Sequence, residues 1–179
     1  MKAAVPPLAG LVLAGGKSER MGRDKGDISY HGKPQRDHLF ELLRPVCASV
    51  FVSLREGQAG PENLPVLYDS FAGLGPFGAI LSAFRAFPNH AWLVVACDLP
   101  LLDKLAIDFL TQNRNPSAVA TAFHNPATGF PDPLITIWEP KSYPILLQFL
   151  AQGYSCPRKV LINSEIETLQ APDPEILRN

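Results

Sequence analysis

A continuous apolar run at residues 92–97 is the feature that most constrains the fold of this chain. A strand in which apolar and polar residues do not alternate has to be buried on both faces. Strands of this kind occur in parallel sheets that carry helices on either side. Residues 8–14 have the same apolar character, so the sequence predicts a buried first strand as well.

The rest of the chain alternates between segments with strand-like and helix-like periodicity. Strands are predicted at residues 50–54, 66–68, 118–123, 134–138 and 166–169, the last at a sheet edge, and helices at residues 34–47, 76–87, 102–112, 144–151 and 158–161. This order predicts a doubly wound α/β protein, a three-layer α/β/α sandwich with a mostly parallel sheet. The length of 179 residues, without an interdomain linker, predicts one domain over residues 1–179.

Composition excludes several classes of function. The net charge is −1 and there is no basic block, so neither nucleic acid nor a membrane is expected as a partner. Cysteines are three in number and form no Cys-x-x-Cys pair, which argues against a zinc site or a disulfide framework. The N-terminal apolar run is too short for a signal peptide. We therefore expect a cytoplasmic protein that is a monomer or a weak oligomer.

A glycine-rich segment with three cations follows the first predicted strand. Gly15 and Gly16 are followed by Lys17, Arg20 and Lys25. Glycines let backbone N–H groups approach an anion closely, and the cations neutralise charge that the amides leave. The segment suits a polyphosphate, and the alternative is an ordinary surface turn.

Two familiar phosphate-binding loops do not match this segment. The P-loop pattern that would end in Gly16-Lys17-Ser18 requires a glycine at the position of Leu11. The dinucleotide pattern G-x-G-x-x-G is not present in residues 15–20 either.

Two carboxylates follow predicted strands at the edge where open α/β sheets bind ligands. In such sheets the ligand lies beyond the carboxyl ends of the strands, which here gives residues 15–25, residues 53–55, Asp69 and Asp98. Asp98 ends the buried strand, where a carboxylate needs a partner, and Mg²⁺ bridging phosphate oxygens is a suitable one. The structural alternatives are a helix N-cap or an Asx-turn for Asp98, and a turn closed with Ser70 for Asp69.

Several motifs occur in order along the chain. They are Leu-Ala-Gly-Gly-x-Ser-x-Arg-Met-Gly-x-Asp-Lys at residues 13–25, Gly-Lys-Pro at 32–34, Asp69 with Gly-Pro at 75–76, Cys-Asp-Leu-Pro at 97–100 and Pro-Asp-Pro-Leu at 131–134. In order and spacing these motifs resemble those of the MobA-like nucleotidyltransferases.

The resemblance implies a Rossmann-like fold of the nucleotide-diphospho-sugar transferase type and a Mg²⁺-dependent enzyme. The reaction it implies is transfer of GMP from GTP to molybdopterin, with release of pyrophosphate. It implies nucleotide contacts from Leu13, Ala14, Gly15, Gly16, Lys17, Lys25, Ser53, Asp69 and Asp98, catalytic roles for Lys25, Arg20 and Asp98, and a metal ligand in Asp98. Relatives carry basic residues where this chain has Arg158 and Lys159, which would suit a second anionic substrate.

Some positions depart from the family pattern. Ser53 stands where relatives often have Asn, and Gly78 comes one residue earlier than the usual glycine after Gly-Pro. The family's Asn-x-Asn-Thr-Pro segment is not matched, because the sequence stops at Asn179. The alternatives to a guanylyltransferase are therefore a cytidylyltransferase, an NTP transferase for a different phosphorylated acceptor, and a non-catalytic GTP-binding homologue.

Overall fold

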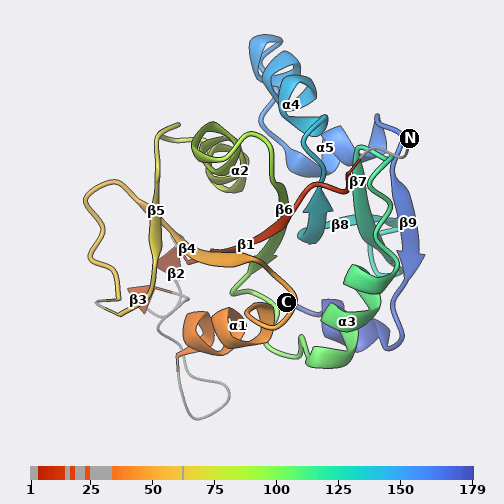
Figure 1. The fold of residues 1–179 in the computed structure, drawn as a ribbon, viewed down its shortest axis with the longest axis horizontal. Helices are drawn as coiled ribbons and strands as arrows, with labels where there is room; N and C mark the ends of the chain where they lie inside the picture. Colours follow the sequence, from red (N-terminus) through yellow and green to blue (C-terminus); the bar gives the residue numbers. More distant parts are fainter. Residues whose placement is uncertain (1–3, 15–16, 19–22, 25–33, 62) are drawn as a thin grey trace.

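A computed structural model describes residues 4–14, 17–18, 23–24, 34–61 and 63–179 of the chain. Within these residues a seven-stranded sheet has the order β5-β4-β1-β6-β8-β7-β9 (Figure 1). Its strands are β1 (Leu8–Leu13), β4 (Ser49–Arg55), β5 (Val66–Asp69), β6 (Ala91–Ala96), β7 (Ala120–Asn125), β8 (Phe130–Trp138) and β9 (Glu167–Gln170). Two short strands, β2 (Lys17–Ser18) and β3 (Arg23–Asp24), pair separately.

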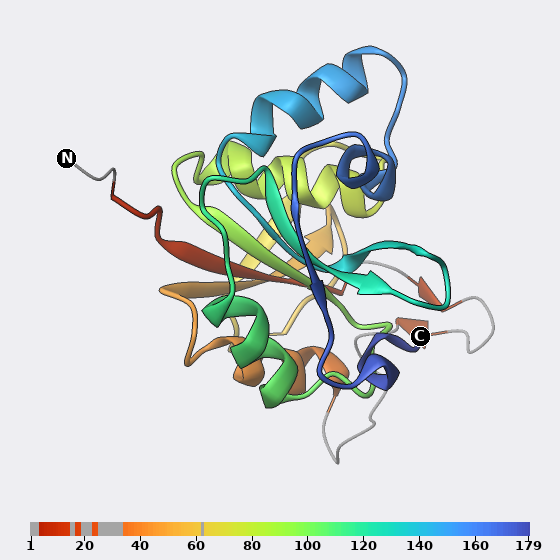
Figure 2. The same cartoon turned by 90° about the vertical axis from the view of Figure 1, so that its right-hand side faces the viewer.

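Helices cover both faces of the sheet (Figure 2). One face is covered by α1 (Gln35–Leu43), α3 (Lys104–Gln112) and a 3₁₀ helix (Pro174–Leu177). The opposite face is covered by α2 (Pro76–Ala86), α4 (Ser142–Ala151) and α5 (Pro157–Ile162). The predicted three-layer sandwich and the predicted edge position of the last strand are thereby confirmed.

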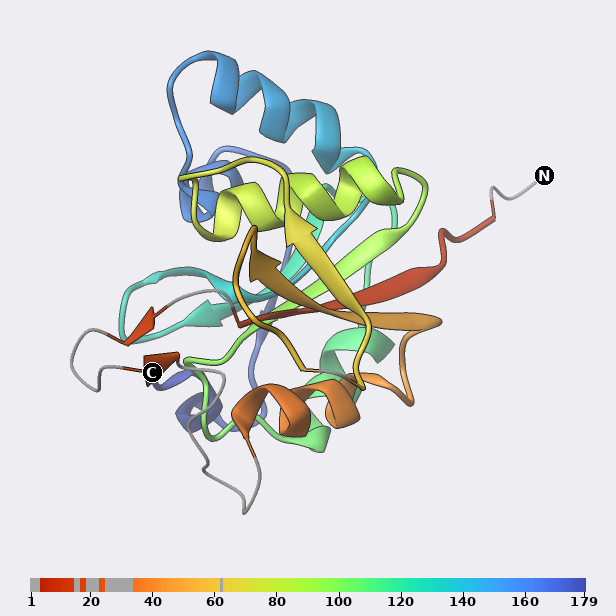
Figure 3. The same cartoon turned by 90° about the vertical axis from the view of Figure 1, so that its left-hand side faces the viewer.

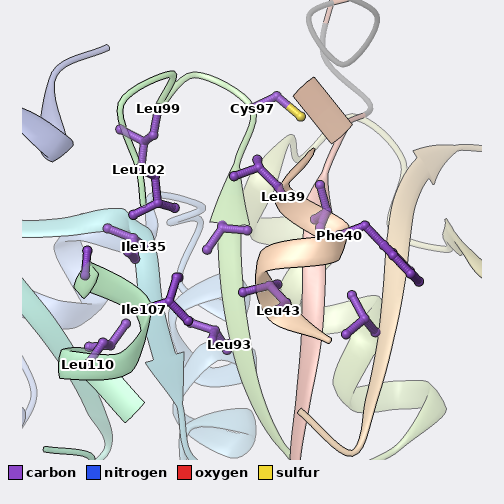
Figure 4. Packing of buried hydrophobic residues seen from close by; sticks show 14 of the residues in the cluster. Leu39, Phe40, Leu43, Leu93, Cys97, Leu99, Leu102, Ile107, Leu110 and Ile135 are labelled. Carbon is purple, nitrogen blue, oxygen red and sulfur yellow. The ribbon is translucent and has the colours of Figure 1, made fainter. Parts of the chain in front are cut away.

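The core consists of two apolar layers that share the central strands. On β6, Leu93 and Val95 pack into the layer below α1 and α3, whereas Trp92 and Val94 pack into the layer below α2. Figure 4 shows Leu93 together with Leu39 and Leu43 of α1 in the first layer. Full burial of one such side chain contributes about 1.5–3 kcal/mol, and β6 gains such contributions from both helical layers.

Close packing of α1 on the sheet depends on Gly10 in the middle of β1. A Cβ atom at this position would lie 3.0 Å from Cδ1 of Leu43 and 3.2 Å from Sγ of Cys47. The absence of a side chain at Gly10 therefore lets α1 pack closely against β1.

Several elements differ in their bounds or direction from the sequence-based expectation, and three of these differences affect the layers around the site. Helix α1 stops at Leu43 rather than residue 47, because Pro45 has no N–H to continue the hydrogen-bond ladder. Helix α3 begins at Lys104 rather than residue 102, because the carboxylate of Asp103 caps it by accepting the N–H of Ala106 at 3.0 Å. Strands β7 and β8 form an antiparallel hairpin, and β8 also runs antiparallel to its other neighbour, β6.

A buried ion pair stabilises the end of the sheet that lies opposite to the carboxyl ends of β1 and β6. Arg114 donates from Nε and Nη2 to the two carboxylate oxygens of Glu139, each at 2.8 Å. Nη2 also donates to the carbonyl of Pro6 at 3.0 Å. The guanidinium therefore joins the segment before β1 to the segments that flank β7 and β8.

We expect Arg114→Met to lower the free energy of unfolding by about 3–5 kcal/mol, because it leaves the buried carboxylate of Glu139 without its partner. The double variant Arg114→Met/Glu139→Leu should recover most of the loss, since no unpaired charge remains. Urea unfolding measures both. Lys104→Met, which breaks the exposed pair between Lys104 and Asp108, is the matched control and should cost less than about 1 kcal/mol. Equal losses for the two ion pairs would contradict this interpretation.

Candidate active site

A pocket of about 690 Å³ opens at the carboxyl ends of four adjacent strands, β5, β4, β1 and β6. Ligand pockets span about 300–1,000 Å³, so this volume suits a small molecule of nucleotide size. Figure 3 shows β4 and β5 side by side below α2, and the N-terminal residues of α2 contribute to the pocket wall. The pocket thus occupies the edge that the sequence predicted for ligand binding.

Four of the residues singled out from the sequence line this pocket: Leu13, Ser53, Asp69 and Asp98. They come from the ends of four different strands and meet because these strands are parallel neighbours. Ala14 is buried, and its N–H donates to the carbonyl of Ser53 at 3.2 Å. This bond joins the end of β1 to β4 at the point where the glycine-rich segment begins.

The other residues of the predicted phosphate site are only partly covered by the structure. Gly15, Gly16, Arg20 and Lys25 lie outside the described residues. For Lys17 the structure gives the backbone, which belongs to β2 and pairs with β3 in an antiparallel ladder. Their assignments stay predictions from the sequence.

Asp69 forms a turn and anchors the neighbouring helix. Its Oδ1 atom accepts the N–H of Phe71 at 2.7 Å and is 2.9 Å from the hydroxyl of Ser82 on α2. A Cβ atom on Gly78 would lie 2.5 Å from the carbonyl of Phe71 and 3.0 Å from Oδ2 of Asp69. The position of Gly78 in this chain therefore follows from the close contact between α2 and the turn. Asp69 has a structural role in addition to facing the pocket.

Asp98 is the second residue after β6 and is half-buried at the pocket wall. It is not the N-cap of the next helix, because that position belongs to Asp103. The loop after it is fixed by Gln35, which is fully buried and donates from Nε2 to the carbonyl of Leu99 at 3.1 Å. One of the two structural alternatives for Asp98 is thereby excluded.

The N-terminus of α2 adds a favourable position for anions. Gly75, Pro76 and Ala79 line the pocket, and Gly75 precedes the helix with φ +58°, a conformation that favours glycine. The first N–H groups of a helix have no hydrogen-bond partner within the helix, and the positive end of the helix dipole lies at the same end. This end of the pocket therefore tolerates negative charge.

Glu56, Gly57, Cys97 and Leu134 also line the pocket, and the sequence analysis assigned them no contact with a ligand. Glu56 and Gly57 form a turn directly beyond β4. A Glu-Gly pair after a strand indicates a turn, but this signal does not say towards which neighbour the turn points.

A buried carboxylate lies next to the pocket residue Leu134. Asp132 is 5% exposed, and it accepts the N–H of Leu134 at 2.8 Å and Nδ2 of Asn125 at 3.0 Å. Burial raises the pKa of the Asp132 carboxyl above its ordinary value, and the hydrogen bonds and the charge of Arg158 lower it in part. The charge of Arg158 thus acts on a buried carboxylate, while Nζ of Lys159 lies 3.7 Å from the ring centroid of Tyr154.

No group of three or more His, Cys, Asp or Glu side chains suited to a metal ion occurs among the described residues. A cation in this pocket would need oxygen atoms from a substrate in addition to a protein carboxylate. In the same part of the chain no helix is long and apolar enough to cross a membrane.

Comparison with known proteins gives a family match over most of the chain. Residues 10–168 match the family described as MobA-like NTP transferase domain. The molybdenum cofactor biosynthesis bifunctional protein of Synechocystis sp. is 37% identical over 170 residues, which cover 93% of this chain and 49% of that protein. The chain therefore spans about half the length of this relative.

Two further proteins match over nearly their full length. The molybdenum cofactor guanylyltransferase of Pseudomonas putida is 30% identical over 184 residues, covering 98% of this chain and 93% of that protein. The crystal structure of molybdopterin-guanine dinucleotide biosynthesis protein A from Archaeoglobus fulgidus superposes with a TM-score of 0.73 at 19% identity, covering 90% of this chain and 83% of that one. The second similarity shows that the two proteins share a fold.

The raised pKa of Asp132 gives a prediction on stability. At a pH below the ordinary pKa of 3.8 the carboxyl is protonated in both the folded and the unfolded state, so its ionisation does not affect the stability of the protein. As the pH rises through the raised folded pKa, the unfolded state loses its proton first, so the stability of the protein falls.

We expect the Tm of the wild type to fall relative to that of Asp132→Asn when the pH is raised from about 3.5 to about 7. The Asn side chain cannot ionise, so its effect on stability does not change with pH. Any change in the Tm difference across pH therefore reports ionisation of Asp132. A change of about 1 kcal/mol corresponds to roughly 2–4 °C in a protein of this size. A Tm difference that is constant across this range would contradict the raised pKa.

Proposed function

Because the chain belongs to the family of MobA-like NTP transferases, we propose that it transfers GMP from GTP to molybdopterin and releases pyrophosphate. The product would be molybdopterin guanine dinucleotide. The name of the Pseudomonas putida relative, a molybdenum cofactor guanylyltransferase, supports transfer of GMP, and the name of the Synechocystis relative supports a role in molybdenum cofactor biosynthesis. The observation that carries the proposal is the pocket at the ends of β5, β4, β1 and β6, next to the start of the glycine-rich segment.

The order of the strands suggests how a nucleotide would lie in this pocket. The glycine-rich segment follows β1 and Asp98 follows β6, and these strands are neighbours. Triphosphate bound there would leave the sugar and base over β4 and β5. In this arrangement Lys17 and Arg20 would hold the β- and γ-phosphates and Lys25 the α-phosphate.

Transfer requires little covalent chemistry from the protein. An oxygen of the acceptor's terminal phosphate attacks the α-phosphorus of GTP and forms a new P–O bond. The bond from the α-phosphorus to the oxygen that bridges to the β-phosphorus breaks, and pyrophosphate leaves. The contribution of the protein is to align the two groups and to stabilise the developing negative charge. Lys25 is the residue to which we assign this stabilisation.

Asp98 fits the role of a metal ligand. NTP transferases of this family generally use a divalent metal, and we propose Mg²⁺. Mg²⁺ is commonly bound by one or two carboxylates together with phosphate oxygens and waters, which suits a pocket wall with Asp98 and no larger cluster of ligands among the described residues. When bound, the ion would neutralise charge on the phosphate oxygens.

The direct test is pyrophosphate release from GTP, CTP, ATP and UTP, each with and without molybdopterin and Mg²⁺. We expect release with GTP and molybdopterin together. Lys25→Ala should lower kcat by roughly 10²-fold or more, because it removes a contact that is strongest in the transition state. Release with CTP in preference to GTP would identify a cytidylyltransferase. GTP binding without release would identify a binding protein, and wild-type kcat in the variant would remove Lys25 from the mechanism.

We expect Asp98→Asn to lower the Mg²⁺-dependent rate by about tenfold or more while changing the Tm by only a few degrees. The amide keeps the size of the side chain and removes the charge that a hard cation requires. Mg²⁺ titrations of the rate and thermal melts measure the two effects. Asp103→Ala is the contrasting variant: loss of the α3 cap should cost about 1 kcal/mol of stability and leave the Mg²⁺ dependence unchanged. A large drop in Tm with normal Mg²⁺ dependence would make Asp98 structural.

A further inference from the structure

The wall of the pocket beyond β4 is a turn with a defined geometry. The N–H of Gln58 donates to the carbonyl of Arg55 at 3.0 Å, which closes the four-residue turn Arg55-Glu56-Gly57-Gln58. Gly57 has φ +81°, and a turn with a positive φ at its third residue favours glycine there. Glu56 is therefore held at the second position of the turn, and it is one of the residues that line the pocket.

The side chain of Gln58 fixes this turn to the strand that leads into the glycine-rich segment. Its Oε1 atom accepts the N–H of Arg55 at 3.1 Å, and its Nε2 atom donates to the carbonyl of Ala14 at 3.4 Å. One carboxamide thus ties the turn after β4 to the end of β1. The turn that carries Glu56 is positioned relative to the proposed phosphate site.

Three carboxylates from the described part of the chain line the pocket, and they differ in what surrounds them: Asp98, Asp69 and Glu56. Asp98 follows β6, at the end proposed for the phosphates. Asp69 uses Oδ1 for the turn and for Ser82. Glu56 is exposed and lies beyond β4, at the end proposed for the base. Ser53, in the same strand, is 5% exposed and offers only a short hydroxyl.

We propose that the carboxylate of Glu56 recognises the base and selects guanine, an inference that rests on the proposed function. Guanine presents two donors side by side, N1–H and the N2 amino group, which a carboxylate accepts with its two oxygens. Adenine, cytosine and uracil each lack this pair of adjacent donors. Each of these bases offers a carboxylate at this position at most one donor, so the carboxylate forms fewer hydrogen bonds with them than with guanine, and this difference discriminates between the bases.

The test compares GTP with two analogues that differ at one position of the base. ITP lacks the N2 amino group, and XTP carries an oxygen in its place. Calorimetry gives the Kd of each nucleotide for the wild type and for Glu56→Gln, without any need for turnover. Glu165→Gln, which changes an exposed carboxylate far along the sequence and outside the pocket lining, is the matched control.

We expect the wild type and Glu165→Gln to bind GTP at least about tenfold more tightly than ITP, as for a hydrogen bond to a charged group, and to bind XTP more weakly still. In Glu56→Gln the ratio of the affinity for GTP to the affinity for ITP should fall towards one. Binding of XTP relative to GTP should rise, since the amide can donate to the new oxygen. The Tm should not change, because Glu56 is exposed on a turn.

An unchanged GTP:ITP ratio in Glu56→Gln, or equal affinities of the wild type for GTP and ITP, would overturn this inference. Either result would leave the proposed function intact if GTP and molybdopterin still gave pyrophosphate. Failure to release pyrophosphate from GTP would instead count against the proposed function, whatever the affinity ratios.

Discussion

Burial of β1 and β6 on both faces is the constraint on which the rest of the structure depends. Strands that contribute only apolar side chains to two helical layers have no place for polar groups along their length. Polar residues can therefore only precede or follow these strands, and the parallel arrangement brings their carboxyl ends together at one end of the sheet. Burial of the core thus confines polar sites on the central strands to the two ends of the sheet, and the pocket lies at the end where the carboxyl ends meet.

The sequence predicted the fold well because apolar periodicity marks the elements directly. The two-sided burial of residues 92–97 and the alternation of strands and helices were enough for the three-layer architecture. The element ends depend on single residues that periodicity does not weigh, such as Pro45 after α1 and the capping carboxylate of Asp103. The β7–β8 hairpin was not predicted, because it is a pairing between two strands with no helix between them.

The candidate site was predictable only where a residue lies at or just beyond the carboxyl end of a strand. Leu13, Ser53, Asp69 and Asp98 meet in the pocket as that rule requires, whereas their roles towards a ligand stay predictions. Glu56 was missed because a hydrogen bond between Gln58 and Ala14, 44 residues apart, positions its turn. Contacts between such distant residues leave no local pattern in the sequence.

The two kinds of interaction proposed for this pocket place different demands on its walls. Attraction between cations and a triphosphate acts over several ångströms and does not depend strongly on orientation. Selection between bases depends on hydrogen bonds with narrow geometry, and a wrong base is penalised only if the wall cannot rearrange to satisfy it. The wall formed by β4 and β5 meets this demand: the Asp69 carboxylate joins its turn to Ser82 on α2, and Gln58 joins the neighbouring turn to β1. Both turns are thus fixed to elements of the core, so the base-selecting end of the pocket derives its rigidity from the same packing that stabilises the sheet.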